Sequence, residues 1–209
     1  MTARRRAPTG RAARLRLRHS LDVALRGAEL LDRKLRILRK RHALLHGQEQ
    51  DAERAWQERL AEAETWLLRG VLLNGERALA TAAPAGRADV TVEWTVSMGV
   101  RHPSGVSCTD AVRSDREPVP ANTALVRAEA AYREAVRAAA ALASARTATR
   151  LMAAEAGRTA RRVRALRQRW IPRLCSELAA VDQALEQAEH EDAVRRRWAA
   201  AQQGHGRGR

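Results

Sequence analysis

Residues 17–66 read LRHSLDVALRGAELLDRKLRILRKRHALLHGQEQDAERAWQERLAEAETW. Positions spaced alternately by four and three residues in this stretch are apolar twelve times in fifteen. They are Leu17, Leu21, Ala24, Ala28, Leu31, Leu35, Leu38, His42, Leu45, Glu49, Ala52, Trp56, Arg59, Ala63 and Trp66. Such spacing places the residues on one face of a helix and is typical of a coiled-coil seam. It predicts a helix over residues 10–70, which Pro8 precedes because proline can start but not continue a helix.

A second stripe with the same alternation occupies the last third of the chain. It comprises Leu125, Ala128, Tyr132, Ala135, Ala139, Leu142, Arg146, Thr149, Ala153, Ala156, Ala160 and Val163. The stripe predicts a second long helix over residues 122–201, with Asn122 or Thr123 as its N-cap. The apolar ladder then continues as Leu166, Trp170, Leu174, Leu178, Val181 and Leu185. Its run of four-residue spacings predicts local unwinding of the supercoil, close to Pro172, which removes one helical hydrogen bond.

The segment between the two helices, residues 71–121, contains a strand pattern. Residues 89–101 alternate strictly, with Val90, Val92, Trp94, Val96, Met98 and Val100 on the apolar side. We expect Gly99, Pro103 and Gly105 to supply the turn, and a weaker partner strand over 106–112. Because a short hairpin alone is marginal in water, it should pack on a helix or on a partner, and its apolar face is predicted to pack on a helix.

These elements predict an all-α fold class: a long antiparallel two-helix coiled coil with a small β-hairpin and short-helix head at the bend. We expect a single elongated domain over residues 1–209, ending in a disordered basic tail over 202–209. Composition agrees, because 3% aromatic and 30% charged residues favour long helices over a compact β-rich core.

The chain is strongly basic, with a formal net charge of +15. Residues 1–42 carry +11, residues 43–122 carry −4 and residues 123–209 carry +8. This balance indicates an acidic partner surface, a nucleic acid or an anionic membrane. The arginines between Arg4 and Arg18 could contact phosphates, but no aromatic residue interrupts them for base stacking. A face turned to solvent or to a protein partner explains this run at least as well.

Catalytic signatures are missing from the sequence. It has no phosphate-binding glycine loop, its six histidines are scattered, and Cys108 and Cys175 form no metal-ligand pattern. We therefore predict no catalytic, cofactor or metal site and two reduced thiols. No stretch approaches the roughly 18 apolar residues of a membrane span, so the protein is predicted to be soluble or peripheral.

Several short motifs, in order along the chain, resemble the D subunit of V-type and archaeal-type rotary ATPases, the central-stalk rotor. The N-terminal group is Pro8, Thr9, Gly27, Leu30, Leu31 and Lys34. The middle group is Met98, Gly99, Val100 and Pro103, and the C-terminal groups are residues 162–166 and then Ile171, Pro172, Arg173 and Leu174. The sequence departs from the family pattern at Arg164, where asparagine is usual.

The resemblance implies a non-catalytic rotor that transmits torque. Its two chain ends would form the axle inside the hexamer of A and B subunits, and its bend would face the membrane ring through a linker subunit. The F subunit would bind the shaft, and the protein would be cytoplasmic and peripheral at the cell membrane, without direct membrane insertion or nucleic-acid binding. The motif residues are then the expected partner and coupling positions. The alternative is a basic coiled-coil scaffold or nucleic-acid-associated protein.

Overall fold

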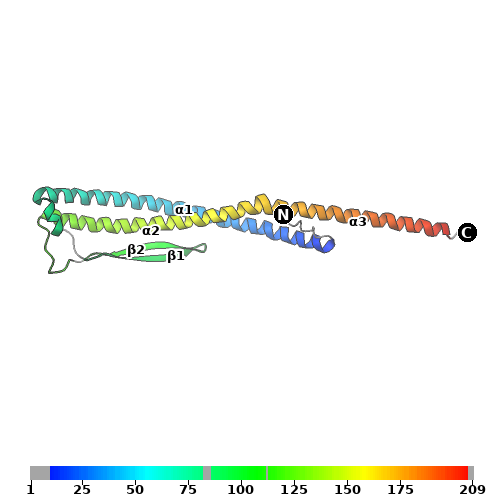
Figure 1. Cartoon of the computed structure of the whole chain (residues 1–209), viewed down its shortest axis with the longest axis horizontal. Coiled ribbons are helices and arrows are strands. Elements are labelled where there is room, and N and C mark those ends of the chain that lie inside the picture. Colours follow the sequence, from blue (N-terminus) through cyan, green and yellow to red (C-terminus); the bar gives the residue numbers. More distant parts are fainter. Residues whose placement is uncertain (1–9, 82–85, 112, 207–209) are drawn as a thin grey trace, which may run out of the picture. The chain divides into compact units, whose positions relative to one another are not determined.

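The computed structural model describes residues 10–81, 86–111 and 113–206. Its elements, in chain order, are α1 (Arg11–Asn74), the 3₁₀ helix η1 (Glu76–Thr81), strands β1 (Asp89–Ser97) and β2 (Val100–Thr109), α2 (Thr123–Ala165), the π-helix η2 (Leu166–Trp170) and α3 (Ile171–Gly206) (Figure 1). The predicted fold class is confirmed: long helices flank a two-stranded antiparallel sheet. Pro8 and Thr9 lie outside the described residues.

The chain divides into two compact units, residues 1–33 with 159–209 and residues 34–158. In the first unit, Leu17 and Ala24 of α1 bury their side chains against Leu174 and Val181 of α3. Two ion pairs flank this seam: Arg14 with Asp182 at 2.6 Å, and Asp32 with Arg167. Burial of the apolar seam, rather than these half-exposed ion pairs, stabilises the helix pair.

The second unit repeats this arrangement with its own core. Leu38 and Leu45 of α1 pack against Ala148 and Met152 of α2, and both Leu38 and Met152 are fully buried. Lys34 Nζ lies 3.1 Å from Glu155 Oε1 on the flank of the seam. Each unit is therefore a two-helix segment of a coiled coil, as the stripes predict.

Most stripe residues face the seam. In the first stripe Arg59 is exposed and the other fourteen are buried or half-buried. In the second, Arg146 and Ala153 are exposed, and the seam there is filled by Ala148 and Met152. The prediction is thus confirmed for the pattern and wrong at these three positions.

The predicted irregularity near Pro172 is a π-helical turn. Ile171 N–H donates to Leu166 O, five residues back, so the helix absorbs one extra residue before the proline, which has no N–H to donate. The extra residue turns Trp170 outward, where it is 49% exposed, and Ile171 takes its place against the core. The predicted seam position of Trp170 is therefore wrong.

The bend of the second unit is closed by Gly70, Gly75 and Asn122. Gly75 follows the end of α1 with φ +73°, and its N–H donates to Val71 O at 2.7 Å, as in a left-handed helix C-cap. Asn122 caps α2 by accepting from Leu125 N–H at 2.8 Å. Its Nδ2 donates to Gly70 O at 3.0 Å and Asn74 Oδ1 at 2.7 Å, which ties the start of α2 to the end of α1.

The hairpin turn lies earlier than the sequence predicts. Met98 and Gly99 have φ values of 54° and 80°, the signature of a two-residue type I′ turn, and β2 begins directly at Val100. Pro103 and Gly105 lie within β2, next to a bulge at Glu93/Trp94. Met98 and Val100 therefore do not continue the apolar face of β1.

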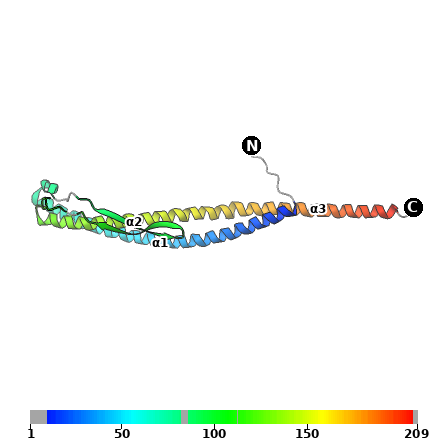
Figure 2. The same ribbon diagram turned by 90° about the horizontal axis from the view of Figure 1, so that it is seen from below.

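The orientation of the hairpin is the main correction. It runs alongside α1 and α2 of its unit (Figure 1, Figure 2), yet Val90, Val92, Trp94 and Val96 are 37–66% exposed. The opposite face packs on the helices: Val100 contacts the core of Leu38 and Met152, and His102 is 1% exposed. The prediction that the apolar face packs on a helix is wrong.

Candidate functional site

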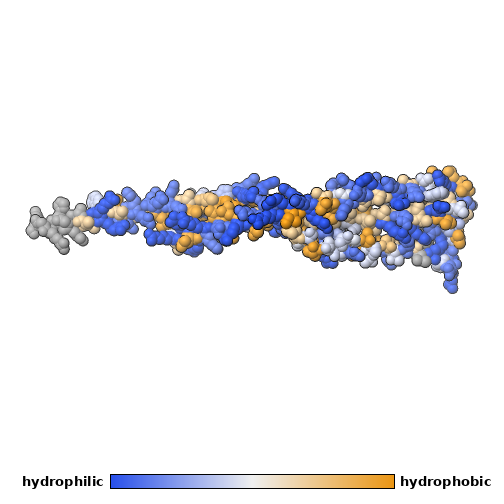
Figure 3. Space-filling view, turned by 180° about the vertical axis from the view of Figure 1, so that it is seen from behind, coloured by the Kyte–Doolittle hydropathy of each residue, from blue (hydrophilic) through white to orange (hydrophobic). Residues whose placement is uncertain are grey.

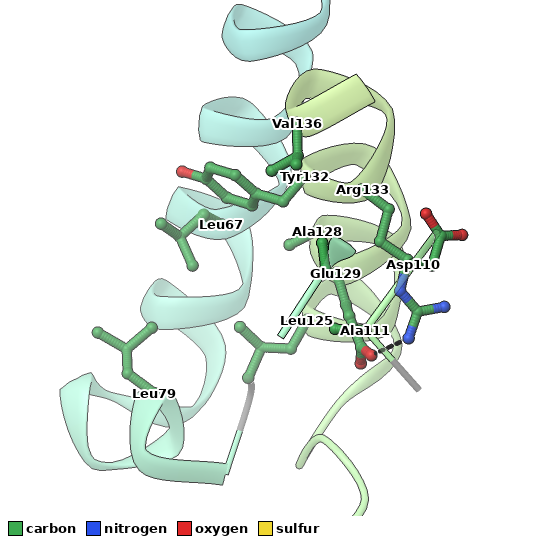
Figure 4. Close-up of a pocket in the computed structure, with 11 residues that line it drawn as sticks. Leu67, Leu79, Asp110, Ala111, Leu125, Ala128, Glu129, Tyr132, Arg133 and Val136 are labelled. Atoms are coloured by element: carbon green, nitrogen blue, oxygen red, sulfur yellow. Dashed lines mark hydrogen bonds and ion pairs between the residues drawn. The ribbon is translucent and has the colours of Figure 1, made fainter. Parts of the chain in front are cut away.

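An apolar cavity of about 320 Å³ lies at the bend of the second unit. Figure 4 shows the side chains of Leu67, Leu79, Leu125 and Tyr132 turned toward one space between α1, η1 and α2. These residues are brought together because Gly70 lets the two helices approach closely beside Leu125. The cavity is open enough and apolar enough to accept a side chain of a partner protein, as binding pockets at interfaces do.

Charged pairs border one side of this cavity. Glu129 accepts from Arg113 at 2.9 Å and from Arg133 at 2.5 Å, the latter marked in Figure 4, and its side chain is 12% exposed. Asp110 pairs with Arg137 beyond it. The hydrogen bond and charge of Asp110 raise the pKa of the Arg137 guanidinium, which favours its charged form. The border is thus a neutralised network, which leaves the cavity itself apolar.

Exposed apolar side chains continue from the cavity over the end of the helix pair. Leu68, Leu72 and Leu73 on α1 are 61–77% exposed, and Val119 before α2 is 74% exposed. Figure 3 shows apolar side chains gathered at this end of the second unit. Trp66 lies between Arg69 and Arg127, whose guanidinium carbons are 4.6 and 5.7 Å from its ring centroid. We call this surface, with the cavity, the bend surface.

The other unit ends differently. Arg11 pairs with Glu189 at 3.0 Å, and α3 continues to Gly206, whereas the predicted helix stops at residue 201. Between residues 186 and 200 of this extension, only Ala193 is half-buried and every other residue is exposed. Trp198 is 71% exposed next to Arg195, Arg196 and Arg197. This extension of α3 therefore carries acidic residues up to Asp192 and three consecutive arginines after them, and its exposed surface is available to a partner.

The predicted coupling residues that the structure describes are spread over α1, the hairpin and α3. Gly27, Leu30 and Leu31 lie on α1, where Leu30 is 64% exposed and Leu31 faces the seam. Ile171 and Leu174 belong to the core of the first unit, and Arg173 pairs with Glu177 at 2.8 Å. The others are placed as follows: Lys34 beside Glu155, Met98 and Gly99 in the hairpin turn, Val100 and Pro103 inward on β2, and exposed Pro172 after the π turn.

Sequence reasoning missed the bend surface. A signal existed in Leu68 and Leu72, which are large, apolar and off the spacing of the α1 stripe. Such residues on a helix are either solvent-exposed or in contact with something other than the paired helix. The cavity has no comparable signal, because Leu67, Leu79 and Tyr132 meet only through the bend.

Neither a metal-ligand cluster nor a membrane-spanning helix is present in the described ranges. Residues 10–81, 86–111 and 113–206 contain no group of three or more His, Cys, Asp or Glu side chains arranged to hold a metal ion. Within that part of the chain, no helix combines the length and apolar character needed to cross a bilayer. Cys108 is half-buried and Cys175 is exposed, and both are free thiols.

The sequence profile of the ATP synthase D subunit family matches residues 13–201, which include both helical units and the hairpin. The chain belongs to this family. It is also 32% identical, over 207 residues, to the D subunit of the V-type ATP synthase of Anaeromyxobacter sp. (strain Fw109-5). That match covers 91% of each chain. As a member of the D subunit family, the chain is a subunit of a rotary ATPase, and the resemblance drawn from its motifs is confirmed.

Proposed function

We propose that this chain is the non-catalytic central-stalk rotor of a V/A-type ATPase, which transmits torque between the A/B hexamer and the membrane ring. The observation that carries the proposal is the family match along almost the whole of a paired-helix chain. A helix pair with interlocked side chains resists bending and twisting better than a single helix. Its seam and flanking ion pairs would transmit rotation from one part of the helix pair to another.

The bend surface fits the end that faces the membrane ring. Its leucines and cavity form an apolar surface held in place by the capping bonds of Asn122, which suits the linker subunit between shaft and ring. Apolar anchors that enter a pocket supply most of the affinity of a stable protein interface. The protein would therefore be held at the membrane through the complex rather than by insertion.

The basic end of α3 fits the hexamer cavity. Its exposed Arg195, Arg196 and Arg197 can meet acidic groups on the inner faces of A and B subunits. Solvent-exposed charged contacts of this kind are individually weak, so one contact can replace another as the shaft turns. The F subunit would bind elsewhere on the shaft. From an axial position, these arginines would not reach a transferred phosphate.

The experiment compares ATP hydrolysis with ion transport in reconstituted vesicles. Deletion of residues 181–209 removes Val181 from the core and all of the exposed extension, so we expect hydrolysis to persist while pumping is lost. Normal coupled pumping after this deletion would contradict the rotor role.

A second truncation serves as the control, because it removes only the two ends of the chain and keeps the paired helices. Deletion of residues 1–6 together with 202–209 leaves the ion pair Arg11–Glu189 and the core of Leu17 and Val181 in place. We expect nucleotide binding by the hexamer to be unchanged and coupling to decline only slightly. Equal loss of pumping in both truncations would show that the extreme ends, rather than the axle, determine coupling.

A further inference from the structure

The hairpin carries an apolar surface that nothing in this chain covers among the described residues. Val90, Val92, Trp94 and Val96 are 50, 37, 47 and 66% exposed, respectively. Across the ladder, Val96 pairs with Arg101. Residues that pair across an antiparallel sheet point to the same face. We call this surface, made of Val90, Val92, Trp94, Val96 and Arg101, the outer face.

The opposite face explains why the outer face cannot simply turn inward. Val100 packs against the core that contains Leu38 and Met152, and His102, which pairs with Thr95, is 1% exposed. Asp110, just after β2, is held by Arg137 of α2. The contacts that hold the hairpin to the helices thus come mainly from β2, and turning the sheet over would break them. Exposed valines and a tryptophan on a fixed surface mark an interaction site.

The charge of the outer face limits the kinds of partner that could bind there. Arg101 lies 5.0 Å above the Trp94 ring on the outer face, whereas Asp89 and Glu93 point to the other side of the described strands. The outer face is therefore apolar with a cation and no carboxylate of its own. Tryptophan and arginine are the residues that most often dominate binding energy at protein interfaces.

Two other occupants fit less well. A second copy of this hairpin would bring Arg101 against the same cationic face, and like charges across an interface cost binding energy. A nucleic acid would meet one cation among valines, and phosphate contacts need several. A protein surface with apolar side chains bordered by carboxylates could cover the valines and pair with Arg101.

We propose that the outer face is a docking surface for another subunit of the same complex, one that presents apolar side chains bordered by Asp or Glu. Trp94 is the central anchor, and Arg101 sets the orientation through the partner's carboxylates. This inference rests on the proposed place of the chain in the complex. It concerns the assembly of the complex rather than torque, so it can fail while the rotor role stands.

The test uses the whole purified complex and a photo-crosslinking residue, benzoylphenylalanine, placed singly on β1. Val96 probes the outer face, and its neighbour Thr95, which pairs with His102 on the inner face, is the matched control. We expect irradiation to join position 96 to an acidic, apolar peptide of a different subunit, and position 95 to α1 or α2 of its own chain. Adducts at 96 that are absent, intrachain, with lipid or with a second copy would each overturn the proposal.

A second measurement reports how tightly the crosslinked subunit is held in the complex. Trp94→Ala and Arg101→Glu should each weaken retention of the crosslinked subunit, measured by native mass spectrometry across dilution, by roughly tenfold or more. Thr95→Ala should change retention less than about twofold. The isolated Trp94→Ala chain should melt like the wild type, because the side chain supports no intrachain core. Equal retention in all three variants would overturn the proposal.

Discussion

The helix seam and the hairpin are both built from regularly spaced apolar residues, but they use them oppositely. In the seam, Leu38 and Met152 are fully buried against their partner helix. On the hairpin, Val96 and Trp94 are turned to solvent while polar Thr95 and Ser97 are half-buried. Periodicity therefore identifies residues that share a face. It does not determine whether this chain or another protein covers that face.

The largest expected effect is Leu38→Asp in the seam. A carboxylate at this fully buried position would have no partner, which we expect to cost about 3–5 kcal/mol of unfolding free energy. Thermal melting followed by circular dichroism measures it. Leu44→Asp, at a position that is 61% exposed on the same helix, should change stability by no more than about 0.5 kcal/mol. Similar losses in both variants would show that the seam face is misassigned.

The next effect compares Gly70 at the bend with Gly47 in the middle of α1, because the two glycines should respond with opposite sign. A Cβ on Gly70 would lie 2.5 Å from Leu125 Cδ2, and Leu125 is fully buried and cannot move aside. We expect Gly70→Ala to destabilise by about 1–3 kcal/mol. Gly47 has open space around it, so Gly47→Ala should stabilise by about 0.8–1 kcal/mol through helix propensity. Urea denaturation distinguishes them, and stabilisation by both would rule out close helix contact at Gly70.

A smaller effect separates the two N-cap candidates of α2. Asn122→Ala loses the cap to Leu125 N–H and the bonds to Gly70 and Asn74, so we expect a loss of about 1–2 kcal/mol. Thr123→Ala, at the first helical position, should fall within about 0.5 kcal/mol of the wild type. The reverse order of the two melting temperatures would assign the cap to Thr123.

The smallest effect is expected on the outer face itself. Val96→Thr keeps the shape of a side chain that is 66% exposed, so the isolated chain should change stability by less than about 0.5 kcal/mol. Val100→Thr, on the other side of the turn, places a hydroxyl against the core of Leu38 and Met152 and should cost about 1–2 kcal/mol. Comparable costs for the two variants would mean that both faces of the hairpin support the fold.

The sequence predicts the long helices well because a stripe of leucine and alanine sustained over many turns has few structural solutions. It fails where a local event interrupts the repeat. The apolar alternation of β1 continues through Met98 to Val100, which conceals a turn that requires positive φ at a methionine. Similarly, the four-residue spacings place Trp170 in the seam, but the π turn rotates it outward. The hairpin turn has no marker in apolar periodicity, and the change of spacing near Pro172 marks an irregularity without showing which side chain turns outward.

The candidate interfaces are less predictable than the fold. The bend surface combines Leu67, Leu79 and Tyr132, which are far apart in sequence and meet through the bend. The motif residues, by contrast, spread along the chain, and several of them, such as Ile171 and Leu174, serve the core. Their role in coupling remains a prediction, as does the single-domain organisation.

The π turn before Pro172 also determines the direction in which the side chains of α3 point. An α-helix advances about 100° per residue, so the one extra residue between Leu166 and Ile171 rotates every outward-facing side chain of α3 by that angle relative to an uninterrupted helix. The arginines of its exposed extension therefore point in directions that this turn determines. A lineage that lost one residue here would keep the composition of the helix but present its charges on another side. Any partner surface that binds those charges would then have to change as well.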